Sequence, residues 1–207
     1  MRTPDQPVLR DIVLIKRFAM NPVPGVRLTL ICRDTHTPYS GMLPGYVAGH
    51  YSYDDVHIDL SRLAEYAGAR FYRAEAMGID RDQKRVICRG RPDVPYDILS
   101  INIGSSPRVS EVEGASDHAV PVKPITGFNN RWLALLSRIE NHDGPLAVAV
   151  VGAGAGGVEL TLAMQFRLKN ELKQRGKDPD QLHFHLFDAA DQILPTRNPK
   201  VREVFRK

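Results

Sequence analysis

The chain has 207 residues, 43% of them hydrophobic and 25% charged, with two cysteines and a formal charge of +4 at pH 7. This composition is typical of a globular protein with one large domain or two small ones, and it excludes disordered and collagen-like chains. Two cysteines are too few for a disulfide framework or a four-cysteine zinc site, and they lie too far apart in the sequence to form a Cys-x-x-Cys pair.

Two short aliphatic runs, Asp11–Ile15 and Val26–Cys32, begin the chain and are typical of buried strands. Only ten residues separate them, whereas the crossover between two parallel strands needs about a dozen or more. If the two strands are parallel neighbours, roughly a dozen residues of the natural chain are missing here. We therefore expect a spatial break between Leu14 and Arg17.

An ordered loop and a short helix are expected next. Residues 35–53 combine glycine, proline and tyrosine, which indicates a loop with room for one short helix. A helix is predicted over Leu60–Ala67, because Asp59 or Ser61 can cap its start and Gly68 follows its end.

The middle of the chain is expected to be mainly β-structure. Residues 70–77 and 85–89 predict a small antiparallel pair joined by a polar turn. Residues 96–103, YDILSINI, predict a further strand that ends at a small-residue turn. Residues 105–125 carry few helical signals and are interpreted as a linker.

A strand–helix–strand unit follows an amphipathic helix in the last third of the chain. Apolar residues recur at helical spacing from Phe128 to Ile139, which predicts one buried helix face. The aliphatic run 146–151 predicts a buried strand, 156–173 a long helix, and 182–187 the next strand. The apolar stretch that begins at Leu146 is too short and too rich in glycine to be a transmembrane helix of about 20 residues.

The strongest motif is G-x-G-x-x-G, formed by Gly152, Gly154 and Gly157 between the predicted strand and the long helix. The first glycine permits a tight turn, the second lets a pyrophosphate approach the backbone, and the third lets the helix pack closely on the strand. Asp188 ends the next strand, although at more than the usual interval of about 20 residues. An acid there can bind a ribose diol and disfavours a 2′-phosphate, so NADH is expected. The alternative is a glycine-rich turn that binds nothing.

The remaining candidate residues carry weaker signals. His183 and His185 share one face of a predicted strand, but no third ligand lies nearby in the sequence, so no metal site is predicted. Cys32 and Cys88 are interpreted as small buried residues. Basic and acidic residues are interleaved, which favours a solvated charged surface and attraction to an anionic ligand over nucleic-acid binding. The N-terminal residues lack the apolar core of a signal peptide, so a cytoplasmic location is expected.

Four segments together resemble a known family: GAGAGGVEL, FDAADQILP, YDILSINIGSSP and TPYSGMLPG. The chain is similar to the FAD/NAD(P)-dependent pyridine nucleotide-disulfide oxidoreductase superfamily. Within it, the likeness is closest to the NADH dehydrogenase-like flavoprotein associated with selenide, water dikinase. The resemblance implies an α/β, Rossmann-like fold with two dinucleotide-binding domains, parallel sheets and a small antiparallel β-meander, with parts of that fold missing.

The resemblance also implies a division of the chain. Residues 1–125 resemble the FAD-binding domain without its glycine loop, and they include the meander at about 70–95. Residues 126–207 resemble a linker helix and the first half of the NAD(P)-binding domain. The cofactor-binding positions that the resemblance assigns, in addition to the glycine motif and Asp188, are Arg33, Tyr39, Ser40, Gly41, Met42, Pro44, Gly104, Ser105 and Glu159.

The function that the resemblance implies is an FAD-dependent oxidoreductase. It would transfer a hydride from NAD(P)H to the flavin and pass electrons to an acceptor, and no side-chain acid or base is assigned as a catalytic residue. The absence of a Cys-x-x-Cys pair disfavours a local dithiol. A quinone, a selenium or sulfur compound, or a partner protein is therefore the expected acceptor, and association with selenide, water dikinase is expected too. The alternative is a non-catalytic nucleotide-binding or regulatory fragment of such a flavoprotein.

Overall fold

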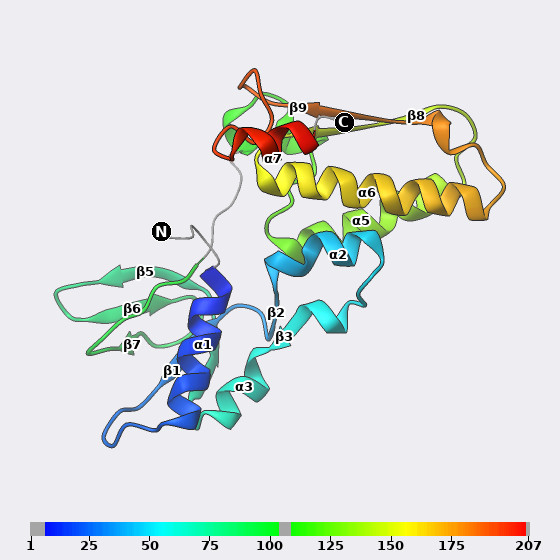
Figure 1. The fold of residues 1–207 in the computed structure, drawn as a ribbon. Helices are drawn as coiled ribbons and strands as arrows, with labels where there is room; N and C mark the ends of the chain where they lie inside the picture. The colour runs from blue at the N-terminus through cyan, green and yellow to red at the C-terminus, as the bar shows by residue number, and fades with distance from the viewer. Residues whose placement is uncertain (1–6, 104–108, 206–207) are drawn as a thin grey trace. The chain divides into compact units, whose positions relative to one another are not determined.

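The computed structural model describes residues 7–103 and 109–205, which belong to two compact units (Figure 1). Unit 1 comprises residues 1–40 and 56–106, and unit 2 comprises residues 41–55 and 107–207. The described strands form three two-stranded sheets, two of them parallel, and one three-stranded antiparallel sheet. The predicted α/β class with parallel sheets and a small meander is therefore confirmed. The domain boundary at residue 125 stays a prediction.

Unit 1 is built on a parallel strand pair. Strand β1 (Thr29–Cys32) runs parallel to β4 (Arg70–Arg73), with Thr29 opposite Arg70. Helix α3 (Leu60–Tyr66) leads into β4, and the Asp59 carboxylate caps it by accepting hydrogen bonds from the Ser61 and Arg62 N–H groups. The predicted helix and its cap are confirmed.

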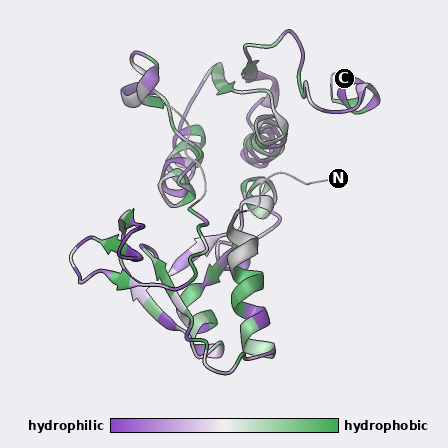
Figure 2. Cartoon of the chain, turned by 90° about the vertical axis from the view of Figure 1, so that its left-hand side faces the viewer, coloured by the Kyte–Doolittle hydropathy of each residue, from purple (hydrophilic) through white to green (hydrophobic). Residues whose placement is uncertain are grey.

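Helix α1 (Pro7–Met20) replaces the strand predicted over residues 11–15, so that prediction is wrong. On a strand, Val13 and Ile15 would share one face. In the structure Val13 is 44% exposed and Ile15 only 3%, as expected when apolar residues divide between the faces of a helix. Charged residues interrupt the hydrophobic ones along α1 (Figure 2). The predicted break is wrong too, because Leu14 and Arg17 both lie inside this helix.

The antiparallel meander of unit 1 consists of β5 (Ala76–Asp80), β6 (Arg85–Cys88) and β7 (Val94–Pro95). The predicted antiparallel pairing is thus confirmed, although the segment 70–77 divides between β4 and β5. The buried side chains of this region are those of Ala74, Val86, Cys88 and Val94. Cys88 is buried as predicted, whereas Cys32 is only half-buried.

The strand predicted over residues 96–103 is wrong, since the structure assigns no strand to this segment. Tyr96 and Leu99 pack partly against the buried residues of the meander. Ile98, in contrast, is 94% exposed. No described strand pairs with the segment. A strand of a parallel sheet is buried on both faces, which is incompatible with the exposure of Ile98. The remaining sheet of unit 1 is a short antiparallel pair formed by β2 (His36–Pro38) and β3 (His57–Asp59).

Unit 2 contains the strand–helix–strand unit predicted from the sequence. Its parallel strands are β8 (Leu146–Val151) and β9 (Leu182–Phe187), with Leu146 opposite Leu182 and Val151 opposite Phe187. Its helices are α2 (Leu43–Ala48), α4 (Ala115–His118), α5 (Ile125–Glu140), α6 (Ala155–Gln174) and α7 (Pro199–Val204). None of the helices in the described residues is long and apolar enough to cross a membrane.

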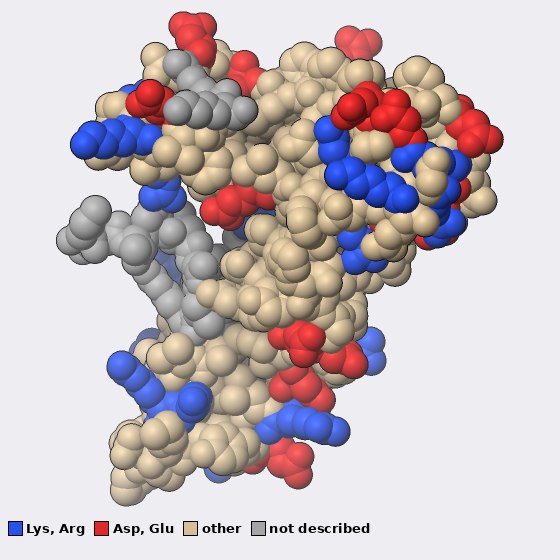
Figure 3. Space-filling model, turned by 45° about the vertical axis from the view of Figure 1, so that its right-hand side comes forward, with Lys and Arg blue, Asp and Glu red and all other residues tan. Residues whose placement is uncertain are grey.

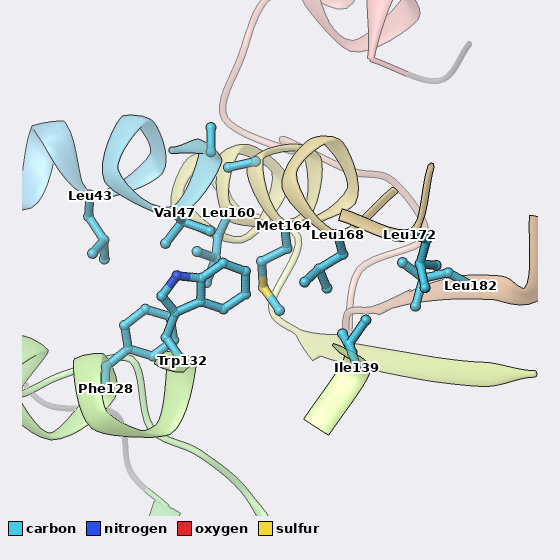
Figure 4. Close-up of a cluster of buried hydrophobic side chains, with 12 residues drawn as sticks. Leu43, Val47, Phe128, Trp132, Ile139, Leu160, Met164, Leu168, Leu172 and Leu182 are labelled. Atoms are coloured by element: carbon cyan, nitrogen blue, oxygen red, sulfur yellow. The ribbon is translucent and has the colours of Figure 1, made fainter. Parts of the chain in front are cut away.

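The core of unit 2 lies between α2, α5 and α6 (Figure 4). Phe128 and Trp132 from α5 pack with Val47 of α2 and Leu168 of α6, all of them buried. Each large apolar side chain removed from water contributes about 1.5–3 kcal/mol. This packing fixes α6, whose first residues carry the glycine motif. Trp132 is the only tryptophan of the chain, so its fluorescence reports the folding of unit 2.

Ion pairs join the other end of α6 to its neighbours. Arg175 lies 2.7 Å from Glu140, and Lys177 lies 3.0 Å from Asp143. The Lys177 ammonium also donates to the Glu140 carbonyl oxygen at 3.2 Å, at the end of α5. Basic and acidic side chains lie beside one another at this end of the unit (Figure 3). Exposed pairs of this kind add at most about 1 kcal/mol each, so packing remains the main source of stability.

Candidate nucleotide-binding site

The glycine motif forms a tight turn between β8 and α6. Gly152 follows β8 with a φ of +105°, a conformation that residues with a Cβ rarely adopt. Its N–H donates to the Phe187 carbonyl oxygen at 2.7 Å, which extends the pairing of β8 with β9. Gly154 is the N-cap residue of α6. The turn therefore leads directly from the parallel sheet into the helix, as the sequence predicts.

Gly157 lies against the backbone of Gly152. A Cβ added at Gly157 would lie 1.7 Å from the Gly152 carbonyl oxygen, so no other residue fits without a shift of the backbone. Thr161, one turn later, donates its Oγ1 hydrogen to the Gly157 carbonyl oxygen at 2.7 Å. This close contact holds the start of α6 against the end of β8.

The space beside Gly154 and Gly156 is open. Apart from its chain neighbours and the backbone of α6 itself, a Cβ added at either position would meet no protein atom within 4 Å. The first N–H groups of α6 have no carbonyl partner inside the helix, and the helix dipole adds partial positive charge there. The first turn of α6 carries no acidic residue. The residues present thus fit a dinucleotide pyrophosphate, which is the anion that such a helix start binds.

Asp188 follows β9 and is bonded to the glycine turn. Its Oδ2 accepts a short hydrogen bond from the Ala153 N–H, and its Oδ1 accepts from the Ala190 N–H at 2.8 Å. The hydrogen bonds from Ala190 and Ala153 hold the pKa of this carboxyl below its ordinary value. Asp188 is therefore ionised at neutral pH. Its assignment as the ribose ligand stays a prediction.

We expect Asp188 to stabilise the turn only while it is ionised. Because its pKa is lower in the folded state, its contribution is complete above the ordinary value of 3.8 and is lost as the pH falls through the lowered value. Asp188→Asn should therefore lower the midpoint of thermal unfolding at pH 7, followed by Trp132 fluorescence. The difference from the unmodified protein should shrink below pH 3.8. A difference that stays constant down to pH 2 would refute this role.

Two residues that the sequence did not single out complete the turn. Ala153, between the first two glycines, is 1% exposed. Its carbonyl oxygen accepts a hydrogen bond at 2.8 Å from the N–H of Leu194, which lies in the segment after β9. No local pattern predicts this contact, because it joins residues far apart in the chain. Glu159, assigned by resemblance, is exposed near the start of α6.

The described positions assigned to FAD lie after β1 and around the start of α2. Arg33 follows β1 in unit 1 and pairs with Asp34 at 3.2 Å. The Tyr39 N–H donates to the Val56 carbonyl oxygen at 2.8 Å. Ser40, Gly41 and Met42 form a 3₁₀ turn, and Pro44 lies in the first turn of α2. Gly104 and Ser105 lie outside the described residues.

The described residues hold no glycine cradle for the FAD pyrophosphate in unit 1. Helix α1 contains no glycine, and Gly25 lies in a turn that opens no helix. Arg33 and Asp34 could contact an adenosine, but a helix start like that of α6 is not found in the described part of unit 1. The cofactor-binding positions of unit 1 therefore stay predictions.

The histidine pair of β9 lies on the exposed face of the strand. The His185 ring stacks on that of Phe187, with ring centroids 6.2 Å apart. Within residues 7–103 and 109–205, no three His, Cys, Asp or Glu side chains lie close enough together to hold a metal ion.

One protein family matches nearly the whole chain. Residues 14–207 match the family described as pyridine nucleotide-disulphide oxidoreductase. The NADH dehydrogenase-like protein YutJ of Bacillus subtilis is 26% identical over 199 residues, which cover 94% of this chain and 50% of YutJ. The type II NADH:quinone oxidoreductase of Staphylococcus haemolyticus is 25% identical over 176 residues, 81% of this chain and 43% of the relative. The chain thus spans half or less of the length of these relatives.

Solved structures show the same fold. The structure of NDH2 from Plasmodium falciparum in complex with NADH superposes with a TM-score of 0.74 at 20% identity, over 91% of this chain and 42% of that one. The sulfide:quinone oxidoreductase of Aquifex aeolicus superposes with a TM-score of 0.63 at 16% identity, over 94% and 46%.

Proposed function

The chain belongs to the pyridine nucleotide-disulphide oxidoreductase family. On that premise we propose that it functions as an FAD-dependent NAD(P)H oxidoreductase of the NADH dehydrogenase-like kind. The observation that carries the proposal is the glycine turn. It leaves open space beside Gly154 and Gly156, at the start of α6. A protein that oxidises NAD(P)H must hold the nucleotide, and this turn has the geometry for its pyrophosphate.

In this proposal the residues of unit 2 bind and orient the nicotinamide nucleotide. The N–H groups at the start of α6 hold the pyrophosphate, and Asp188 accepts hydrogen bonds from the adenosine ribose. Glu159, exposed near the start of α6, would lie toward the nicotinamide, as the family resemblance implies. FAD, when bound, supplies the acceptor for the hydride. The family supports FAD as cofactor, while the cradle for its pyrophosphate has no counterpart in the described part of unit 1.

We propose a quinone as the acceptor, because relatives such as that of Staphylococcus haemolyticus are named NADH:quinone oxidoreductases. A selenium or sulfur compound, with association with selenide, water dikinase, stays the alternative that the segment TPYSGMLPG suggests. The cytoplasmic location also stays a prediction.

A second candidate function is nucleotide binding without catalysis. The observation that favours it is the single glycine cradle, in unit 2, among the described residues. An anaerobic absorption spectrum of the purified chain, before and after NADH is added, separates the two. Flavin absorbance that NADH bleaches supports the oxidoreductase, and NADH binding without flavin absorbance supports the second candidate. Absence of NADH binding contradicts both.

The coenzyme preference follows from Asp188. Its negative charge should repel the 2′-phosphate of NADPH, so we expect NADH to bind more tightly, by roughly tenfold as for one unfavourable charge contact. Asp188→Ser should narrow the preference, whereas Asp191→Ser, which removes an exposed acid three residues away, should leave it unchanged. Isothermal titration with NADH and with NADPH measures the ratio of the two affinities in each variant. Equal affinities in the unmodified protein would refute the role of Asp188.

A further inference from the structure

We propose that Leu194 is a positioning residue that holds the glycine turn in its nucleotide-binding conformation. The inference rests on the proposed nucleotide binding of unit 2. It assigns a role to the segment 188–197, which follows β9 and contacts the turn.

Hydrogen bonds made by both backbone polar groups of Ala153 join the turn to this segment. The Ala153 N–H donates to the Asp188 carboxylate, and the Ala153 carbonyl oxygen accepts from the Leu194 N–H at 2.8 Å. The neighbouring Gly152 N–H donates to Phe187. Both backbone polar groups of the residue between Gly152 and Gly154 are therefore bonded to chain beyond β9.

The backbone of Leu194 is unusual for a residue with a large side chain. Its φ is +51°, in the left-handed region that disfavours residues with a Cβ. Its side chain is only 4% exposed, so burial offsets the cost of this conformation. The Leu194 carbonyl oxygen accepts from the Arg197 N–H at 2.9 Å, and Arg202 of α7 donates a short hydrogen bond to Gln192. The segment is thus held on both sides of Leu194.

The consequence concerns the free protein. A glycine-rich turn is flexible by composition, and ordering it on binding would reduce affinity. With Ala153 fixed from outside, the N–H groups that follow it are already directed toward the site before a nucleotide arrives. Leu194 would therefore contribute to affinity without touching the ligand.

The test compares three substitutions at Leu194 with a control. Leu194→Ala removes the buried side chain, and Leu194→Val puts a β-branched residue where φ is positive, which that side chain tolerates poorly. Leu194→Met keeps the volume and should behave like the unmodified protein. The control is Leu172→Ala, which removes a buried side chain near the far end of α6. All are assayed below their unfolding transitions, followed by Trp132 fluorescence.

Two readouts are needed. In the ligand-free protein, hydrogen–deuterium exchange of residues 150–158 should rise at least tenfold in Leu194→Ala and Leu194→Val and stay unchanged in Leu172→Ala. NADH affinity should fall about tenfold in the same two variants only. If Leu194→Val and the control exchange at the rate of the unmodified protein, the inference is wrong. If exchange rises as expected but the unmodified protein binds no NADH, the proposed function fails while the positioning of the turn stands.

Discussion

Gly154→Val should abolish NADH binding and leave unit 2 folded. The φ of Gly154 is −70° and its ψ 178°, an extended conformation that valine adopts readily. A Cβ there meets no protein atom within 4 Å apart from its chain neighbours, so we expect the free protein to accommodate the side chain. The same space is where the pyrophosphate would approach the backbone. We expect an affinity loss on the order of 100-fold or more by isothermal titration.

The matched control is Gly127→Val in α5. Gly127 is another glycine of unit 2 whose Cβ would have open space, but it lies far from the turn in sequence. This variant should bind NADH like the unmodified protein. Unchanged affinity in Gly154→Val, with Trp132 fluorescence showing a folded unit, would mean that the nucleotide binds elsewhere.

Gly157→Val, in contrast to Gly154→Val, should greatly lower the stability of unit 2. The added Cβ would lie 1.7 Å from the Gly152 carbonyl oxygen. The backbone fixes the position of a Cβ and the oxygen is itself a backbone atom, so no side-chain rotation relieves the clash. Overpacking of this kind costs about 1–3 kcal/mol, and more where the backbone must move. Urea unfolding followed by Trp132 fluorescence measures the effect.

Gly154→Val is the natural comparison, because the same exchange three residues earlier meets no clash. We expect its unfolding midpoint to stay close to that of the unmodified protein, while that of Gly157→Val falls clearly. Equal stability of the two variants would contradict the close contact between the ends of β8 and α6.

The strand–helix–strand unit could be predicted from the sequence because its signals are local. Alternating and continuous aliphatic runs specify β8 and β9, and the glycine motif specifies the turn between β8 and α6. The amphipathic spacing from Phe128 to Ile139 likewise specifies α5. These patterns depend on neighbours within a few residues, so they can be recognised in the sequence without knowledge of the tertiary structure.

The errors lie where a local pattern fits two structures. The run at residues 11–15 is short and aliphatic, which fits a buried strand as well as a helix, and the structure continues α1 through it. Residues 96–103 have the composition of a strand but lack a partner strand in the described part of the chain. The motif spacing indicates Asp188 as the acid of the site, but not its hydrogen bond to the Ala153 N–H. The contact of Ala153 with Leu194 joins residues far apart in the chain, so no spacing rule indicates it.

Equilibrium binding of NADH to the purified chain tests the glycine turn as a nucleotide site most directly. Isothermal titration measures it for the unmodified protein and for Gly154→Val side by side. We expect saturable binding at a single site and loss of this binding in the variant. ADP should compete with NADH, because it carries the adenosine and the diphosphate that the turn and Asp188 would hold. Absence of binding to the unmodified protein, or equal binding to both, would contradict the assignment of the glycine turn as a nicotinamide nucleotide site.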